Sequence, residues 1–239
     1  MKTITLIIFS TILIGCAPVY YVPNTQNIPI MKTKGQTNLG IAYSEGEFTK
    51  GYELQAAHAV TNHIALQLNT DWVKNFENMT TNDYSEEFKA SGNMLEVGIG
   101  YFNDIAPNFT FETYGLICFG KLKYEPISAT DNQDFSAKFN RIGIQPSLSY
   151  SRKYFNASFS SRIVHLKYKN VNGNLNDINP NYLKENNAYW LLEPALTLQA
   201  GFEDVKFQLQ YIHSYNLTNS SFEQETDIIS FGIKLNINP

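Results

Sequence analysis

The chain has 239 residues, of which 43% are hydrophobic, 14% aromatic and only 17% charged. Soluble globular domains carry about 25% charged residues, so charge is scarce in this chain. Basic residues number 18 and acidic residues 22, which gives a net charge of -4 and argues against a nucleic-acid-binding protein. The length allows one domain or a small pair and excludes large multidomain machinery.

Residues 1–15 are typical of a secretory signal peptide. Lys2 supplies a positive charge, and the apolar run over residues 4–14 is shorter than the roughly 20 residues that span a bilayer as a helix. The run closes with LIGC at Cys16, which resembles the lipobox of bacterial lipoproteins. This resemblance implies cleavage before Cys16 and acylation of that cysteine with a fatty acid such as palmitate. Ala17, where inner-membrane lipoproteins often carry Asp, favours the outer membrane.

The sequence predicts neither a disulfide nor a cysteine metal site. Cys16 and Cys118 are the only cysteines, and an acylated Cys16 leaves Cys118 without an intrachain partner. No other metal site and no cofactor are expected. Residues 16–35 contain three prolines and have no hydrophobic period, so they are interpreted as a lipidated cysteine followed by an extended tether. Residues 36–239 are predicted to form one β-barrel domain.

Ten segments after the tether alternate apolar and polar residues with period two, which is typical of strands with two different faces. The predicted strands are 36–43, 51–60, 63–74, 93–102, 109–124, 137–151, 155–169, 188–200, 205–217 and 225–237. Short connections alternate with longer polar ones at 44–50, 75–92, 125–136, 170–187 and 218–224. This alternation favours an all-β fold, a closed antiparallel up-and-down transmembrane β-barrel of about ten strands. Closure also removes exposed strand edges.

The polar face of each predicted strand decides which face meets lipid. In segment 137–151, Ile142, Ile144 and Leu148 alternate with Gly, Gln and Ser. Small polar residues suit a narrow lumen, so the apolar face is predicted to point outward. Segment 109–124 has no decisive polar face, and Glu112 is assigned inward on charge alone. Pro146 and Pro194 fall in mid-strand, where proline removes a ladder donor or marks a bulge.

The lipobox, the tether and the strand pattern together resemble the small outer-membrane β-barrel lipoproteins of Bacteroidota. Members of that group often have a Tyr-Val-Pro-Asn stretch between the cysteine and the first strand, found here at residues 21–24. The group is largely without assigned function. The resemblance implies a lipid-anchored protein of the bacterial outer membrane, with membrane lipid as its partner and its long loops outside the cell.

Six charged residues on the predicted inward faces lie at similar heights. Buried charges must be paired or solvated, and the interiors of eight-stranded barrels are already filled by side chains. We therefore predict a structural ion-pair belt that plugs the lumen, with a selective pore or a catalytic carboxylate pair as alternatives. The predicted belt consists of Glu53, Asp71, Glu96, Arg141, Arg162 and Glu193.

The four histidines, His58, His63, His165 and His213, have no metal-ligand spacing and belong to no catalytic motif. Strand parity predicts His58 and His213 on the outer face, near the short-turn rim or the membrane interface. The long-loop ends of neighbouring strands offer no matching Asp and His, so no catalytic residues are predicted.

Many tyrosines and tryptophans fall near predicted strand ends and suit interfacial girdles. Tyr84 and Tyr182 lie in predicted loops, where they are either solvated or part of a carbohydrate-binding platform. The sequence thus predicts a non-enzymatic barrel with a structural or surface-interaction role through its long loops. One alternative is a barrel enzyme acting on lipid or peptide, which requires a His or carboxylate cluster at the loop rim. The other is a tethered soluble barrel that binds an apolar ligand in an apolar lumen.

Overall fold

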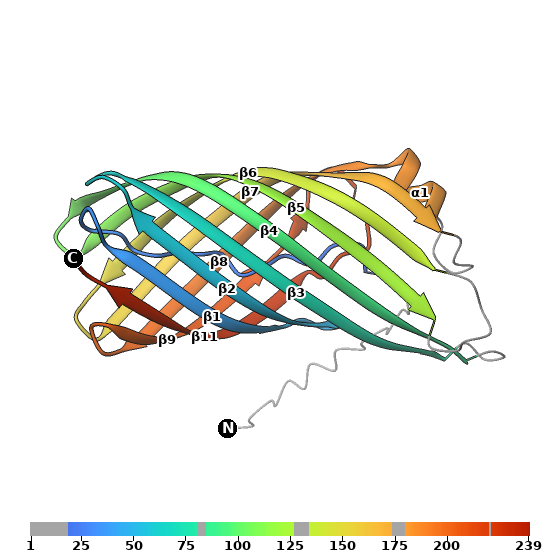
Figure 1. The fold of residues 1–239 in the computed structure, drawn as a ribbon, viewed down its shortest axis with the longest axis horizontal. Helices are drawn as coiled ribbons and strands as arrows, with labels where there is room; N and C mark the ends of the chain where they lie inside the picture. Colours follow the sequence, from blue (N-terminus) through green and yellow to red (C-terminus); the bar gives the residue numbers. More distant parts are fainter. Residues whose placement is uncertain (1–18, 81–84, 127–133, 174–179, 220) are drawn as a thin grey trace, which may run out of the picture.

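The computed structural model describes residues 19–80, 85–126, 134–173, 180–219 and 221–239, which form a closed antiparallel β-barrel (Figure 1). The elements are β1 (Thr37–Glu45), β2 (Thr49–Ala59), β3 (Ile64–Thr80), β4 (Ser85–Ala106), β5 (Phe109–Pro126), β6 (Phe135–Ser151), β7 (Phe155–Gly173), α1 (Pro180–Glu185), β8 (Ala188–Gly201), β9 (Val205–His213), β10 (Tyr215–Asn216) and β11 (Asp227–Ile237).

Neighbouring strands pair around the whole circumference of the barrel. β1 pairs with β11, and β9 pairs with both β11 and β8, which closes the sheet. β10 also pairs with β8 and continues β9 after an interruption at Ser214, so the two parts count as one wall strand. The predicted ten-stranded up-and-down barrel is therefore confirmed. Within the described residues, no helix has the length and apolar composition needed to cross a membrane.

Two of the predicted long loops are wrong. Most of segment 75–92 belongs to β3 and β4, which pair continuously from Ile64 opposite Tyr101 to Thr80 opposite Ser85. The predicted loop over 44–50 is reduced to residues 46–48 between β1 and β2. The sequence pattern ended these strands where apolar alternation stopped. Backbone pairing does not need apolar side chains, so the strands continue beyond that point.

The two faces of the wall have the predicted orientation. Ile142, Ile144 and Leu148 are 54%, 51% and 43% exposed on the outer face of β6, whereas Arg141 and Ser149 are buried in the lumen. The same alternation runs through the other strands and leaves a continuous apolar outer surface. Apolar surface of this extent on a soluble monomer would be exceptional, and it is what a membrane-spanning barrel presents to lipid.

The two uncertain features of the strand assignment are also resolved. Glu112 of β5 is fully buried and faces the lumen, as predicted. Pro146 and Pro194 do not mark bulges, because the pairing register is the same on both sides of each proline. The register shifts instead between Asp104 and Ala106, at the short-turn end of β4, and at the start of β6.

Residues 19–35 run lengthwise through the lumen and form the blue trace inside the barrel in Figure 1. At the rim that carries the longer connections, Tyr124 Oη donates to the Val19 carbonyl at 2.6 Å. At the rim that carries the short turns and the C-terminus, Gly35 N donates to the Ala59 carbonyl at 2.8 Å. We call residues 19–35 the threaded segment. The part of the predicted tether that the structure describes is extended and lies inside the barrel, because its polar groups find partners on the lumen wall.

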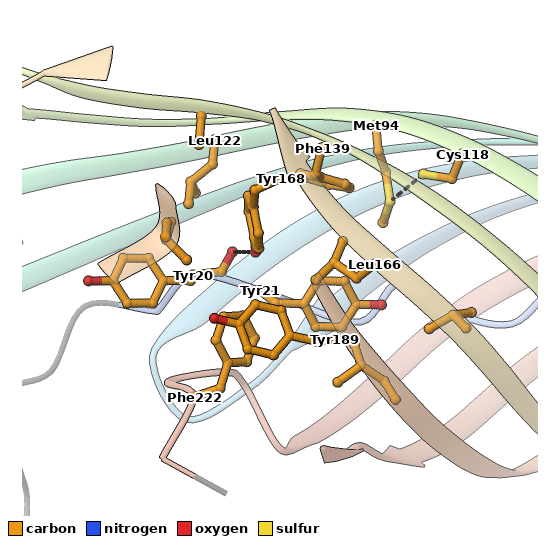
Figure 2. Close-up of a cluster of buried hydrophobic side chains, with 14 of the residues drawn as sticks. Tyr20, Tyr21, Met94, Cys118, Leu122, Phe139, Leu166, Tyr168, Tyr189 and Phe222 are labelled. Carbon is orange, nitrogen blue, oxygen red and sulfur yellow. Dashed lines mark hydrogen bonds between the residues drawn. The ribbon is translucent and has the colours of Figure 1, made fainter. Parts of the chain in front are cut away.

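Aromatic side chains close the lumen at the long-loop rim (Figure 2). Tyr189 and Phe222 stack with ring centroids 3.9 Å apart, and Tyr168 Oη donates to the Tyr20 carbonyl at 2.6 Å. A smaller cluster around Met31, Phe102 and other side chains fills the lumen near the short-turn rim. Apolar packing at both ends thus encloses a polar middle section.

Candidate functional site: the lumen network and the outer rim

The six residues of the predicted charge belt all face the lumen and are at most 3% exposed. They come from six different wall strands, which places them around the threaded segment: Glu53 (β2), Asp71 (β3), Glu96 (β4), Arg141 (β6), Arg162 (β7) and Glu193 (β8). Strand parity alone puts them inward, since each lies between two outward residues.

Arg162 connects two wall carboxylates with the threaded segment. Its Nε donates to Glu193 Oε2 at 2.6 Å, and the two residues are directly opposite each other in the β7–β8 register. Its Nη1 lies 3.7 Å from Glu96 Oε1. Its Nη2 donates to the Asn24 carbonyl at 3.0 Å. The fixed fork of a guanidinium suits this arrangement, because its donors reach several acceptors at once.

Arg141 makes a second set of contacts with the same segment. It pairs with Glu96 Oε2 and donates to Asn24 Oδ1 at 2.7 Å. Its Nη1 donates to Tyr21 Oη at 2.5 Å, and Tyr21 Oη donates to Glu193 Oε1 at 2.6 Å. Tyr21 and Asn24 are therefore members of the network that the sequence did not identify, because their segment was interpreted as a tether and no contacts with the barrel wall were predicted for it.

Glu53 and Asp71 are adjacent across the β2–β3 ladder, and neither belongs to the ion pairs found among the described residues. The Glu53 carboxylate accepts Thr25 N at 2.9 and 3.1 Å and also the Thr25 hydroxyl. In the described part of the chain, Asp71 Oδ1 has no hydrogen-bond partner. The belt is thus one network, in which Arg141 and Arg162 share Glu96, beside a separate carboxylate pair.

Lys234 and Glu112 extend the network toward the short-turn rim. Lys234 Nζ donates to Asn27 Oδ1 at 2.9 Å and to Gln55 Oε1 at 2.5 Å. Glu112 accepts the backbone N–H groups of Ile30 and Met31 at 3.1 and 3.0 Å. Lys234 could have been found from the sequence, because it alternates with the outward apolar residues of the last strand.

The outer face carries a His–Asp pair that the sequence analysis missed. His213 Nδ1 lies 2.7 Å from Asp227 Oδ1, and Tyr211 Oη donates to the same oxygen. The pair lies at the long-loop ends of β9 and β11, where His213 and Asp227 are opposite in register. The outer-face position predicted for His213 is confirmed, but the expectation that the long-loop ends of neighbouring strands offer no matching Asp and His is wrong. The pair could not be recognised from spacing, because His213 and Asp227 are 14 residues apart and become neighbours only through the pairing of β9 with β11.

The other histidines have separate surroundings. His58 Nδ1 lies 2.9 Å from Thr37 Oγ1 near the short-turn rim, and the His165 ring lies 4.8 Å from that of Trp190. Among the described residues, no group of three or more His, Cys, Asp or Glu side chains could hold a metal ion. Tyr182 is partly buried and stacks on Tyr20 with ring centroids 6.2 Å apart, so it is not a fully solvated loop residue. Tyr84 lies outside the described residues.

Lysines gather on the outer face of the wall near the long-loop rim. Lys138 of β6 is directly opposite Lys121 of β5 on one side and Lys169 of β7 on the other. All three side chains are exposed. Like charges directly opposite each other disfavour strand pairing. An anion bound between these three ammonium groups would therefore stabilise the paired strands. We call Lys121, Lys138 and Lys169 the lysine row.

No protein-family model and no curated protein matches this chain. Several solved structures are similar in fold. The outer membrane protease OmpT from Escherichia coli has a TM-score of 0.50 and 9% identity, covering 86% of this chain and 94% of that one. The N-terminal β-barrel domain of Pseudomonas aeruginosa OprF has a TM-score of 0.40 and 8% identity, covering 86% and 100%. At 9% identity the likeness to OmpT shows the fold alone, that of an outer-membrane β-barrel.

Proposed function

We propose that this chain is a lipid-anchored, non-conducting barrel of the bacterial outer membrane, with a structural or surface-interaction role at its long-loop rim. The observation that carries this proposal is the filled lumen. The threaded segment occupies the barrel, and the two arginines that hold it, Arg141 and Arg162, are at most 1% exposed. Such packing supports a plug rather than a path for ions or solutes.

The outer surface supports a position in the membrane with the long-loop rim outside the cell. Short turns at one rim and longer connections at the other are the usual arrangement of outer-membrane barrels, with the short turns in the periplasm. With this orientation the lysine row faces the outer leaflet. Its ammonium groups suit lipid phosphates, which makes outer-membrane lipid the proposed partner.

The plug is tested by recording current across planar bilayers that contain the purified full-length protein. We expect no steady conductance, because the wall residues and the threaded segment exclude water from the belt. Insertion is verified by the altered gel migration of the unheated, folded barrel recovered from the bilayer material. A steady ion current from the unmodified protein would show that the barrel is a channel.

The lipid anchor is tested by metabolic labelling with a fatty acid. Cys16→Ser should abolish the label and leave the precursor with its signal peptide attached. Cys118→Ser is the matched control, since Cys118 is buried in the lumen and should not affect labelling. A label that persists in Cys16→Ser would exclude acylation at this residue.

The His213–Asp227 pair supports a second candidate, a barrel enzyme acting on lipid or peptide. A carboxylate that orients a histidine is a common arrangement for general-base catalysis, and this pair is accessible at the loop rim. The enzyme proposal requires that His213→Ala abolish hydrolysis of a lipid or peptide substrate while the barrel stays folded. The soluble-barrel alternative is not supported, because the middle section of the lumen is charged and the outer surface of the barrel is apolar.

A further inference from the structure

The direction of the threaded segment determines where the N-terminus leaves the barrel. Val19 and Tyr20 are held at the long-loop rim, where Tyr20 N donates to the Glu223 carbonyl at 2.9 Å. Gly35 is held at the opposite rim, beside Ala59 and the C-terminal Pro239. The chain therefore traverses the lumen once before β1 begins. β1 then runs back along the wall in the reverse direction, toward the long-loop rim.

From this path we infer that the mature N-terminus lies on the long-loop side of the membrane, so that the acyl chains on Cys16 enter the leaflet at the long-loop rim. This inference rests on the proposed function for the acylation and for the orientation of the barrel. It places the lipid anchor and the C-terminus on opposite sides of the membrane.

Chain length excludes the other leaflet. Cys16 is three residues from Val19, and three extended residues reach at most about 11 Å. The apolar band of an outer-membrane barrel is about 25 Å tall. An acylated cysteine that starts from the long-loop rim therefore cannot reach the leaflet at the short-turn rim, whatever path residues 16–18 take.

The contacts of the threaded segment also require an order of assembly. The Gln210 side chain accepts Gln26 N at 2.7 Å and donates to the Gln26 carbonyl at 3.0 Å. Thr25 N is bound by Glu53 from another strand. Partners from two different wall strands, β9 and β2, thus bind consecutive residues of the threaded segment. Since an acylated end cannot be drawn through a lumen packed in this way, the wall must close around the segment.

The location is tested by labelling single cysteines with a membrane-impermeant maleimide, in a Cys118→Ser background. Acylated Cys16 has no free thiol and does not react. Pro18→Cys reports on the N-terminus, with Ala17→Cys as a second variant if the first does not fold. Ser221→Cys marks the long-loop rim, and Lys34→Cys marks the short-turn rim, since both positions are exposed. Intact and permeabilised cells are compared, and the gel migration of the unheated protein verifies folding.

We expect Pro18→Cys to behave as Ser221→Cys does, with labelling in intact cells, whereas Lys34→Cys is labelled only after permeabilisation. If Pro18→Cys instead follows Lys34→Cys, the N-terminus leaves at the short-turn rim and the inference is wrong. If Ser221→Cys and Pro18→Cys are both protected while Lys34→Cys is labelled in intact cells, the path is correct but the proposed orientation fails. Absence of fatty-acid label on the wild-type protein would show that the proposed acylation is wrong, while the inferred path of the chain through the lumen would stand.

Discussion

Arg162 is a residue whose surroundings depend on the closed lumen. It is fully buried, and its charge is balanced by Glu193 at 2.6 Å and Glu96 at 3.7 Å. Removing charges from water has a large free-energy cost, which an ion pair offsets only while both partners are present. The local effect of a substitution here therefore reports whether water enters the belt.

Arg162→Ala should lower the free energy of unfolding by about 3–5 kcal/mol, because it leaves the buried Glu193 without its cation and Glu96 with Arg141 alone. Unfolding of the purified barrel in detergent, followed by heat-dependent gel migration, measures this change. Lys153→Ala is the matched control, since Lys153 forms an exposed pair with Glu203 at 3.9 Å and should cost less than about 1 kcal/mol. Equal, small losses in both variants would indicate a water-filled lumen.

Strand alternation identifies some residues of the lumen network and misses others. Alternation along a strand places Arg162 and Glu193 on the inward face, and matching heights bring them together. The same reasoning could not identify Asn24 or Tyr21, whose contacts with the arginines depend on a segment without periodicity. Nor could it show that Asp71, which also lies inward, forms no ion pair with any residue the structure describes.

At the scale of the strand, the two faces perform different tasks. The outer face of β8 presents Leu196 and Leu198, which are 51% and 37% exposed, whereas Thr197 is buried in the lumen. The sequence predicted these faces because a period of two is a local property. It could not fix the long-loop ends of β3 and β4, since those depend on pairing with a neighbour rather than on side-chain pattern.

Leu196→Arg should destabilise the barrel in lipid vesicles by roughly 2–4 kcal/mol, the cost of a cationic side chain at the bilayer midplane. Leu196 lies five residues from the end of β8, near the middle of a span of about 9–11 residues. Phe202→Arg, in the short turn after β8, is the control and should cost about 0–1 kcal/mol. Reversible unfolding in vesicles measures both, and equal costs would contradict a membrane-embedded face.

The lysine row is an element-scale feature, since it exists only when β5, β6 and β7 are paired. Each basic residue near an anionic membrane surface contributes about 1 kcal/mol of attraction. Wild-type protein should therefore resist heat better in vesicles that contain phosphatidylglycerol than in zwitterionic ones. Replacing the three lysines of the row with Gln should remove most of this difference. Replacing Lys34, Lys153 and Lys184, which lie outside the row, should not. An equal loss in both triple variants would show that only net charge matters.

At the scale of the whole molecule, the volume enclosed by the wall explains why the threaded segment lies inside the barrel. Eight-stranded barrels are filled by wall side chains, and a ten-stranded barrel encloses more space. Many lumen positions here carry small residues, such as Ser147, Ser149 and Ser158. The strand pattern predicted the barrel and the charge belt in its lumen but not the threaded segment, because an Asn-Thr-Gln-Asn run is equally compatible with water and with a polar lumen. The run at residues 24–27 is the signal that could have suggested an enclosed segment.

Deletion of residues 19–35 should convert the closed barrel into a conducting one. The strand ladders, including the closing pair from Thr37 opposite Ile237 to Glu45 opposite Ile229, do not involve the deleted residues, so the wall can still form. Arg141 and Arg162 would then face water, and heat resistance should fall while ion current appears in planar bilayers. A synthetic peptide of residues 19–35 added to the bilayer chamber should reduce that current, whereas a scrambled peptide should not. A deletion variant that migrates as a folded barrel but carries no current would show that the wall side chains alone close the lumen.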